Sequence, residues 1–286
     1  MKKSLLYLIL ISFHFQALAG GGWTAGKGQG YAKLSQNAII ADQFFAPDGE
    51  IIDITTISLY TSSLYLEYGI TDKLELNVYM PFFVRSTLNN VERRQSGRIE
   101  PGDEVNSFGD TDLRLKYQIH NSEKVVIAAS LLLGLPLGKT AGGKTKNGDD
   151  RILQTGDGEF NQLIMLEASK SFYPKAFYSS IGIGFNNRSN GFSDEIRWLF
   201  ELGYSGFEDW LLALKIYSIH PLKNGNEAEG AGMGVFGNNI QYISFGPEIN
   251  YFIKNDFGIS GGIGLAIASK NILAAPNYGI GLFKTF

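Results

Sequence analysis

Long stretches of this 286-residue chain alternate between apolar and polar residues, and this period of two constrains the fold more than any other feature. In KLELNVYMPFFVRS, one face carries Leu74, Leu76, Val78, Met80, Phe82 and Val84, and the other carries Glu75, Asn77, Tyr79 and Arg85. GDTDLRLKYQIH and SDEIRWLFELGY repeat the scheme. Successive side chains of a β-strand point to opposite faces, so the alternation indicates long strands. Strands of soluble proteins usually have about five or six residues, whereas a tilted membrane-spanning strand needs about nine to eleven.

The connections between these stretches alternate in length. Short turns read GITDK, HNSEK, FYPK, FEDW and KNDFG, and longer polar loops span roughly 41–55, 87–108, 139–157, 187–193, 222–238 and 269–276. Tight turns on one side and long loops on the other are typical of outer-membrane barrels. The sequence therefore predicts an all-β fold, a transmembrane antiparallel β-barrel of about 12 strands. An even number of strands places both termini on the periplasmic side.

The N-terminus reads as an export signal. Lys2 and Lys3 precede the apolar run LLYLILISFHF, and small residues follow at Ala17 and Ala19. This order is typical of a signal peptide, and the run is too short for a spanning helix. We expect residues 1–19 to be a signal peptide cleaved after Ala19, and residues 20–286 to form a single outer-membrane barrel domain.

Composition excludes several other classes of protein. The formal net charge of −3 lacks the basic character of nucleic-acid-binding proteins, so no nucleic-acid partner is expected. The chain contains no cysteine, so an exported form depends on packing or backbone pairing rather than on disulfides. The mean hydropathy of −0.03 is what alternating strands produce, because their lipid-facing and lumen-facing residues average out.

Aromatic residues flank the predicted short turns. They are Tyr68, Tyr117, Tyr173, Phe207, Trp210 and Phe257, together with the terminal Phe286, and they predict a periplasmic aromatic girdle. The last stretch, PNYGIGLFKTF, also alternates. We expect it to close on the first strand, because an open edge in lipid leaves backbone groups unpaired. A terminal aromatic strand also resembles the signal read by the barrel-assembly machinery, which is the expected partner during biogenesis.

The same parity directs a set of charged residues inward. The candidates for the lumen and its constriction are Glu67, Glu75, Asp110, Asp112, Arg114, Lys116, Glu195, Arg197, Glu201, Lys215 and Glu248. Twelve strands leave an interior between the filled core of an eight-stranded barrel and the open channel of a sixteen-stranded one. Charges of both signs should form cross-strand pairs there. They predict a narrowing at Arg114 and Lys116, or, alternatively, pairs that only fill the lumen.

Two short motifs point to chemistry that their surroundings do not support. GKTAGGKT (138–145) has the spacing of a phosphate-binding loop, but turn-forming residues follow where that chemistry requires a helix. FNNRSNGFSDE (185–195) resembles the active-site stretch of outer-membrane phospholipase A, a twelve-stranded barrel. Asn187 stands where the histidine of that enzyme would lie, which leaves Ser189 without a general base. No catalytic residue is expected, and the chain is not expected to be an enzyme.

Acidic residues gather in the predicted loops. They are Asp42, Asp48, Glu50, Asp53, Asp149, Asp150, Asp157 and Glu159. Carboxylates of this kind can bind calcium, but the twelve-residue spacing of an EF-hand loop is absent. Solvated loops explain these residues, so neither a metal nor a cofactor is expected.

Four longer motifs occur in order: YGITDKLELNVYMPF, SFGDTDLRLKYQI, LLLGLPLGKT and SNGFSDEIRWLFELGY. Over roughly residues 57–286 they resemble the outer-membrane transporter family named for the phenol meta-degradation (MetA) pathway, with a distant likeness to fatty-acid and aromatic hydrocarbon channels. The resemblance implies a channel, embedded in outer-membrane lipid, for passive uptake of a small hydrophobic or aromatic solute. A long N-terminal plug is not expected, because only about ten residues, 20–29, precede the first strand. A structural or adhesive barrel without transport and a lipid hydrolase remain the alternatives.

Overall fold

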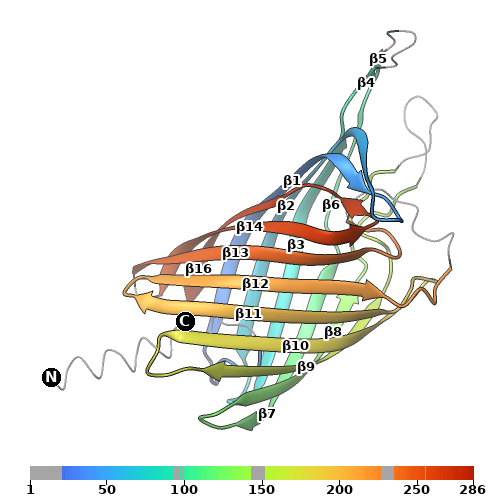
Figure 1. Ribbon diagram of the computed structural model, residues 1–286. Helices are drawn as coiled ribbons and strands as arrows, with labels where there is room; N and C mark the ends of the chain where they lie inside the picture. The colour runs from blue at the N-terminus through green and yellow to red at the C-terminus, as the bar shows by residue number, and fades with distance from the viewer. Residues whose placement is uncertain (1–20, 93–96, 98, 143–151, 227–234, 255) are drawn as a thin grey trace.

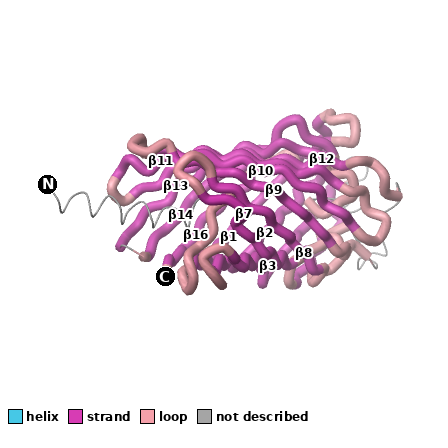
Figure 2. Tube along the Cα trace, turned by 90° about the horizontal axis from the view of Figure 1, so that it is seen from below, coloured by secondary structure: helices cyan, strands magenta, loops and turns pink. Residues whose placement is uncertain are grey.

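The computed structural model describes residues 21–92, 97, 99–142, 152–226, 235–254 and 256–286. Twelve long strands form the wall of a closed barrel (Figures 1 and 2). They are β1 (Gly30–Phe45), β2 (Ile51–Gly69), β3 (Leu74–Leu88), β7 (Thr111–Asn121), β8 (Val126–Leu135), β9 (Asn161–Ser171), β10 (Phe177–Arg188), β11 (Glu195–Phe207), β12 (Trp210–Pro221), β13 (Gln241–Lys254), β14 (Phe257–Lys270) and β16 (Asn277–Thr285). Four short strands complete the sheets: β4 (Val91–Glu92), β5 (Ile99–Glu100), β6 (Asp103–Ser107) and β15 (Ile272–Leu273). In the described part of the chain no helix is long and apolar enough to cross a membrane. The predicted signal peptide, residues 1–19, lies outside the described residues.

Every long strand pairs antiparallel with its two neighbours, and β1 closes the circle by pairing with both β2 and β16. The β1–β16 ladder runs from Tyr31 opposite Thr285 to Ile39 opposite Asn277. Beyond it, Gly30 and Phe286 exchange backbone hydrogen bonds of 2.8 and 3.0 Å. The last residue of the chain is therefore part of the seam. The predicted closed antiparallel barrel of about 12 strands is confirmed.

Along each strand, alternate residues face the interior and the outside. Glu75 and Asn77 of β3 are buried, whereas Leu76 and Val78 between and beside them are partly exposed, as the sequence predicts. A bulge then changes the parity, because Pro81 and Phe82 together oppose the single residue Ser63. Proline cannot donate to the ladder and is confined to such irregular positions.

This bulge overturns two of the predicted orientations at the end of β3. Val84 was expected to lie on the same face as Val78, but it is buried and only 2% exposed. Arg85, expected to point inward, is exposed and forms an ion pair of 2.8 Å with Glu104 of β6.

Two of the predicted loops are largely strand. The 41–55 loop is in fact five residues, 46–50, because β1 continues to Phe45 and β2 begins at Ile51. Within the 87–108 segment, β6 pairs with β3 and β4 pairs with β5 in a hairpin that projects from the barrel (Figure 1). A membrane-spanning strand needs only about nine to eleven residues, but the alternation of apolar and polar residues continues beyond that length, and so do these strands.

The predicted girdle residues lie beside the short turns, and the structure leaves all of them exposed. They are Tyr68, Tyr117, Tyr173, Phe207, Trp210, Phe257 and Phe286. Phe207 and Trp210 flank the β11–β12 turn, and Phe257 begins β14. Their place at a membrane interface stays a prediction. We call the end of the barrel with Gly30 and Phe286 the terminal end, and the opposite end the loop end.

Two neighbouring substitutions on β1 test the orientation of the wall. Leu34 faces outward among Leu64 and Leu282, and Ser35 faces inward. At about 3.4 Å per residue on a tilted strand, Leu34 lies roughly 10 Å from the level of Tyr68, well inside an apolar band about 25 Å tall. Leu34→Arg should therefore cost about 2–4 kcal/mol, and Ser35→Arg much less.

The measurement is the fraction of heat-modifiable, folded barrel recovered from membranes on a detergent gel. Equal recovery of the Leu34 and Ser35 variants would contradict the assigned faces.

Candidate functional site

The segment before the first strand, residues 21–29, folds back into the barrel. Trp23 is buried, and its ring meets that of Tyr178 on β10 edge to face, with centroids 5.8 Å apart. The Gly22 amide donates to Ser169 Oγ on β9 at 2.8 Å. A side chain at Gly22 would collide with the Val126 carbonyl, so glycine is what allows this close approach. The sequence predicts no long plug, and the structure adds that even the short segment 21–29 enters the lumen of a barrel of this size.

The other half of this segment is held on the opposite wall. The Ala25 amide donates to Glu75 Oε2 at 2.5 Å, and the Gly28 amide donates to the Gly69 carbonyl at 2.8 Å. The segment therefore crosses the lumen from the β2–β3 turn to β9 and β10. Around Trp23 the terminal end is filled by an apolar cluster consisting of Tyr31, Val126, Tyr178, Leu211, Phe252 and Phe283, with Tyr65 packed against it.

Above this floor lies a cavity of about 440 Å³, which we call the lower chamber. Gly21 forms part of its base, and the charged residues on its wall include Lys33, Glu67, Arg114, Glu167, Glu201, Lys215 and Glu248. Five of these, Glu67, Arg114, Glu201, Lys215 and Glu248, belong to the predicted lumen set. A second, smaller cavity of about 230 Å³ shares Lys33, Lys215 and Glu248 with it.

The predicted charge cluster on β7 separates into two pairs. Lys116 Nζ lies 2.7 Å from Glu75 Oε1, and Lys116 is only 2% exposed. Arg114 pairs instead with Glu167, two strands away on β9. Lys116 therefore lies enclosed against the N-terminal segment and helps to hold Glu75, whereas Arg114 faces the lower chamber. The structure does not place the two together at one narrowing.

The remaining acids of the lower chamber also have partners. Glu248 accepts from Lys215 at 3.2 Å and lies 3.5 Å from Lys33. The Tyr65 hydroxyl donates to Glu67 at 2.5 Å, and the Tyr178 hydroxyl donates to Glu201 at 2.7 Å. Each of these acids thus has a partner, a base for Glu167 and Glu248 and a tyrosine hydroxyl for Glu67 and Glu201, and charges of both signs line this part of the lumen.

A third cavity, of about 430 Å³, opens towards the loop end and forms the upper chamber. One side of it is polar, with Asp110, Asp157, Arg188, Glu195 and Arg197. The facing side, from β1, β2 and the segments around β15, is largely apolar: it carries Ile39, Leu59, Ile240, Ile272, Leu273 and Ala275, with Asn37, Thr61 and Asn277 among them. The upper chamber is therefore two-sided, with one wall for hydrogen bonds and one for apolar contact.

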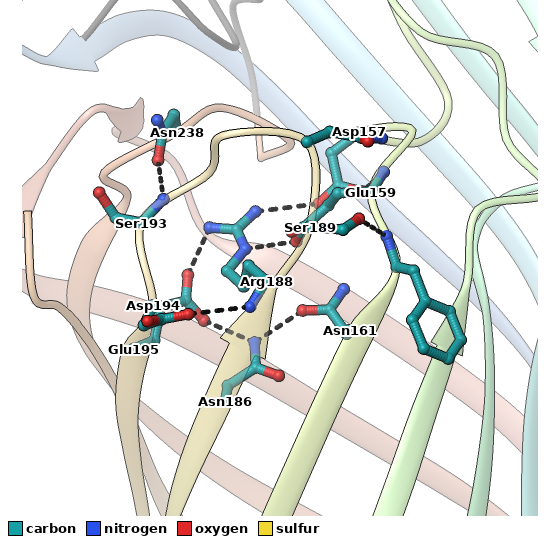
Figure 3. Close-up of polar contacts among 12 residues, drawn as sticks. Asp157, Glu159, Asn161, Asn186, Arg188, Ser189, Ser193, Asp194, Glu195 and Asn238 are labelled. Carbon is teal, nitrogen blue, oxygen red and sulfur yellow. Dashed lines mark hydrogen bonds and ion pairs between the residues drawn. The ribbon is translucent and has the colours of Figure 1, made fainter. Parts of the chain in front are cut away.

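Arg188, at the end of β10, organises the polar side of the upper chamber (Figure 3). Its guanidinium forms ion pairs with three carboxylates: Nε with Glu159, NH1 with Glu195 at 2.6 Å and NH2 with Asp157 at 3.2 Å. The ring of Phe192 covers it, with Cζ 4.6 Å from the centroid. The side chain is only 4% exposed. Arg188 therefore ties the β8–β9 loop, which carries Asp157 and Glu159, to the wall of the barrel.

Two more contacts fix the same loop end. The Gln154 amide group donates to the Phe236 carbonyl at 2.9 Å. Figure 3 shows the second contact, in which the Ser193 amide donates to Asn238 Oδ1 at 3.0 Å. Asp110 accepts from the amides of Gly138 at 2.9 Å and Asp157 at 2.8 Å. Three separate connections thus meet over the upper chamber and narrow its entrance.

Sequence reasoning missed Arg188 although the signal was present. In the stretch FYSSIGIGFNNR, the residues that share its parity are Tyr178, Ser180, Gly182, Gly184 and Asn186, and all of these except the two glycines are polar. Reading the alternation through the weakly hydrophobic glycines would have placed Arg188 inward. The convergence of Asp157 and Glu159 on it depends on the path of a long loop, which carries no such pattern.

The residues of the excluded chemical motifs have structural partners. Ser189 Oγ accepts the Phe160 amide at 2.7 Å, and Asn187 donates to Asp194 at 3.0 Å (Figure 3). His220 is exposed and pairs opposite Ile196, with parity opposite to the lumen-facing Ile219. The end of the phosphate-loop-like motif, 143–145, and the acidic residues Asp149 and Asp150 lie outside the described residues.

Comparison with known proteins supports the fold. No protein-family model matches the sequence, and no curated protein matches it. Among solved structures, the COG4313 outer membrane channel from Pseudomonas putida F1 is similar, with a TM-score of 0.68, 15% identity and coverage of 93% of this chain and 98% of that one. The NanC porin aligns with a TM-score of 0.55 and 8% identity over 89% of this chain and 100% of that one. At these identities the likeness establishes a shared fold, that of outer-membrane channels and porins.

Removing the guanidinium of Arg188 should release the β8–β9 loop from the wall of the barrel. Arg188→Met leaves three buried carboxylates facing one another, and breaking a buried pair in this way costs about 3–5 kcal/mol. The matched control is Arg85→Met, because the Arg85–Glu104 pair is about half exposed and should contribute about 0–1 kcal/mol. Protease cleavage within 152–160 of the folded barrel measures the loop directly. Equal cleavage of the two variants would contradict the role given to Arg188.

The packing of the same loop should also depend on pH. Burial raises the pKa of Asp110, which precedes β7, to about 7, and the charge of Asp157 acts in the same direction. Burial likewise raises the pKa of Asp157 to about 6, and the nearby Glu159 acts in the same direction while Arg188 opposes it. An aspartate in the unfolded chain has a pKa of about 3.9, so the folded state binds the protons on Asp110 and Asp157 more tightly than the unfolded state does. The two protonated carboxyl groups therefore stabilise the folded state fully below about pH 4, and this stabilisation is lost as the pH rises through 6 to 7.

Hydrogen exchange of residues 153–160, corrected for the intrinsic rate, should therefore show stronger protection at pH 5 than at pH 8. Asp110→Asn should reduce the difference. Stronger protection at pH 8 would contradict the prediction.

Proposed function

We propose that this protein is a channel of the bacterial outer membrane for passive uptake of small hydrophobic or aromatic solutes. The observation that carries the proposal is the two-sided upper chamber, which opens at the loop end of a closed barrel and leads towards the lower chamber. Its apolar wall offers contact to a hydrophobic solute, and the polar wall keeps the remaining surface hydrated. Binding pockets for small molecules commonly combine apolar walls with a few polar groups in this way.

The same proposal assigns the orientation of the barrel. The terminal end, with its short turns, faces the periplasm, and the loop end faces outward. The seven girdle residues then lie at the inner interface of the lipid, and Phe286 is presented to the barrel-assembly machinery during biogenesis. Cleavage of the signal peptide after Ala19 would leave residues 20–29 free to enter the lumen.

The interior argues against a general porin for ions. Charges of both signs line the lower chamber, with Arg114 on Glu167 and with Lys33 and Lys215 on Glu248, which argues against a strong preference for anions or cations. The apolar cluster around Trp23 closes the terminal end. A solute therefore passes only when the side chains of this cluster move apart. This requirement agrees with slow, selective uptake. The resemblance to the phenol meta-pathway family agrees with this class of solute and remains a prediction.

The two alternatives have weaker support. A purely structural barrel has no need for two chambers of more than 400 Å³ each. A lipid hydrolase needs a nucleophile with a general base, and Ser189 instead accepts a backbone amide. We infer that the protein is not an enzyme.

Transport by the unmodified barrel and by two tryptophan variants tests the proposal. Porin-deficient cells with the barrel should accumulate a small aromatic solute faster than cells without it, and an uncoupler should not change the initial rate. Trp23→Ala removes the centre of the floor and should raise single-channel conductance in planar bilayers. Trp210→Ala, on the outer face, is the matched control and should leave conductance unchanged. No uptake above background by the unmodified barrel would overturn the proposal.

A further inference from the structure

The upper and lower chambers meet at one level of the barrel. Asn37 and Tyr79 are the two residues that line both cavities. On β2, Thr61 lines the upper chamber and Ser63 the lower. On β12 the same division falls between Ile219 and Tyr217, and on β11 between Arg197 and Leu199. The boundary therefore crosses the lumen from β11 and β12 to β1, β2 and β3. On the side of β13, β14 and β16 the smaller cavity spans it, because that cavity shares Ser244, Gly264 and Asn277 with the upper chamber and Lys33, Lys215 and Glu248 with the lower; Asn37 lines all three.

Long polar side chains occupy this boundary. Arg197 contacts Glu195 through Nε at 2.8 Å and NH2 at 2.7 Å, and its side chain keeps 17% of its surface exposed. Tyr217 interacts with Arg197, and its ring lies 6.2 Å from that of Tyr242. Together with Tyr79 from β3, these side chains reach into the lumen from opposite arcs of the wall.

Arg197 and Arg188 differ in the number of carboxylates that each one holds in place. Glu195 also accepts from Arg188 NH1 at 2.6 Å and from Asn186 at 3.2 Å. If Arg197 is removed, Glu195 keeps these partners, whereas Asp112 loses the nearby positive charge of Arg197. Arg188, by contrast, holds three carboxylates. The contact with Glu195 thus fixes the guanidinium of Arg197 at the boundary without making the loop end depend on it.

We propose that Arg197, with Tyr79 and Asn37, forms a waist that determines which solutes pass from the upper to the lower chamber. This inference rests on the proposed uptake function and names the specificity-determining residues of its pathway. A guanidinium plane and tyrosine rings offer stacking and cation–π contact to a flat aromatic solute. A branched or globular solute of similar mass gains none of these contacts. The waist therefore favours planar aromatic solutes.

Because the chain contains no cysteine, single cysteines can report access to each chamber. Thr61→Cys places a thiol above the waist, and Ser35→Cys places one below it. Both are conservative changes on neighbouring strands. The probe is benzyl methanethiosulfonate, applied to porin-deficient cells, with labelling followed by a mass shift. The Ser35→Cys thiol should react about tenfold more slowly than the Thr61→Cys thiol, which corresponds to a barrier of roughly 1.4 kcal/mol at the waist.

Two further substitutions should change passage through the waist in opposite directions, one making it easier and the other harder. Arg197→Ala should speed labelling of the Ser35→Cys thiol and leave that of Thr61→Cys unchanged. Asn37→Phe should slow the Ser35→Cys reaction further, and it provides the test if the Arg197 variant does not fold. Equal labelling of the two thiols in the parent barrel, or a ratio that neither change alters, overturns the waist while leaving the uptake function intact. If neither thiol reacts in the folded barrel but both react after denaturation, the loop end is closed, and the proposed function falls with the waist.

Discussion

The backbone ladder that closes on itself is the constraint on which the rest of this structure depends. In hydrocarbon an unpaired amide or carbonyl costs several kcal/mol, so each strand of the wall must have two neighbours. The chain meets this requirement to its last residue, where Phe286 exchanges hydrogen bonds with Gly30. Once twelve strands are closed, the width of the interior is fixed, and that width lies between the filled interior of an eight-stranded barrel and the aqueous channel of a sixteen-stranded one.

The contents of the lumen follow from this intermediate width. Near the terminal end the remaining space is taken by residues 21–29, which bring Trp23 into an apolar cluster. Beside this segment Lys116 pairs with Glu75 on the neighbouring strand, and higher up Arg114 of β7 pairs with Glu167 of β9 along the wall. At the loop end the chain itself folds inward and is tied to the wall. Among the described residues the two chambers lie between these three zones.

The fold was predictable from the sequence because a closed sheet imposes a period of two on every strand, and the pattern around Glu75 and Asn77 follows it. Prediction failed where that period is interrupted. Pro81 introduces a bulge, so Val84 and Arg85 exchange faces. It also failed where segments without a period meet. The entry of Trp23 into the lumen and the approach of Glu159 to Arg188 depend on contacts between remote parts of the chain, which local alternation does not encode.

The N-terminal segment also constrains how the barrel can be assembled. Gly22 binds Ser169, 147 residues away, from inside a wall whose seam joins the first strand to the last. A segment that lies within a closed ring must enter before the ring shuts or thread through its end afterwards. The span of the Gly22–Ser169 contact means that β9 and β10 have to be in place before the segment can dock. Docking of the segment therefore comes after β9 and β10 have paired, and it either precedes closure of the β1–β16 seam or proceeds through the terminal end of the finished barrel.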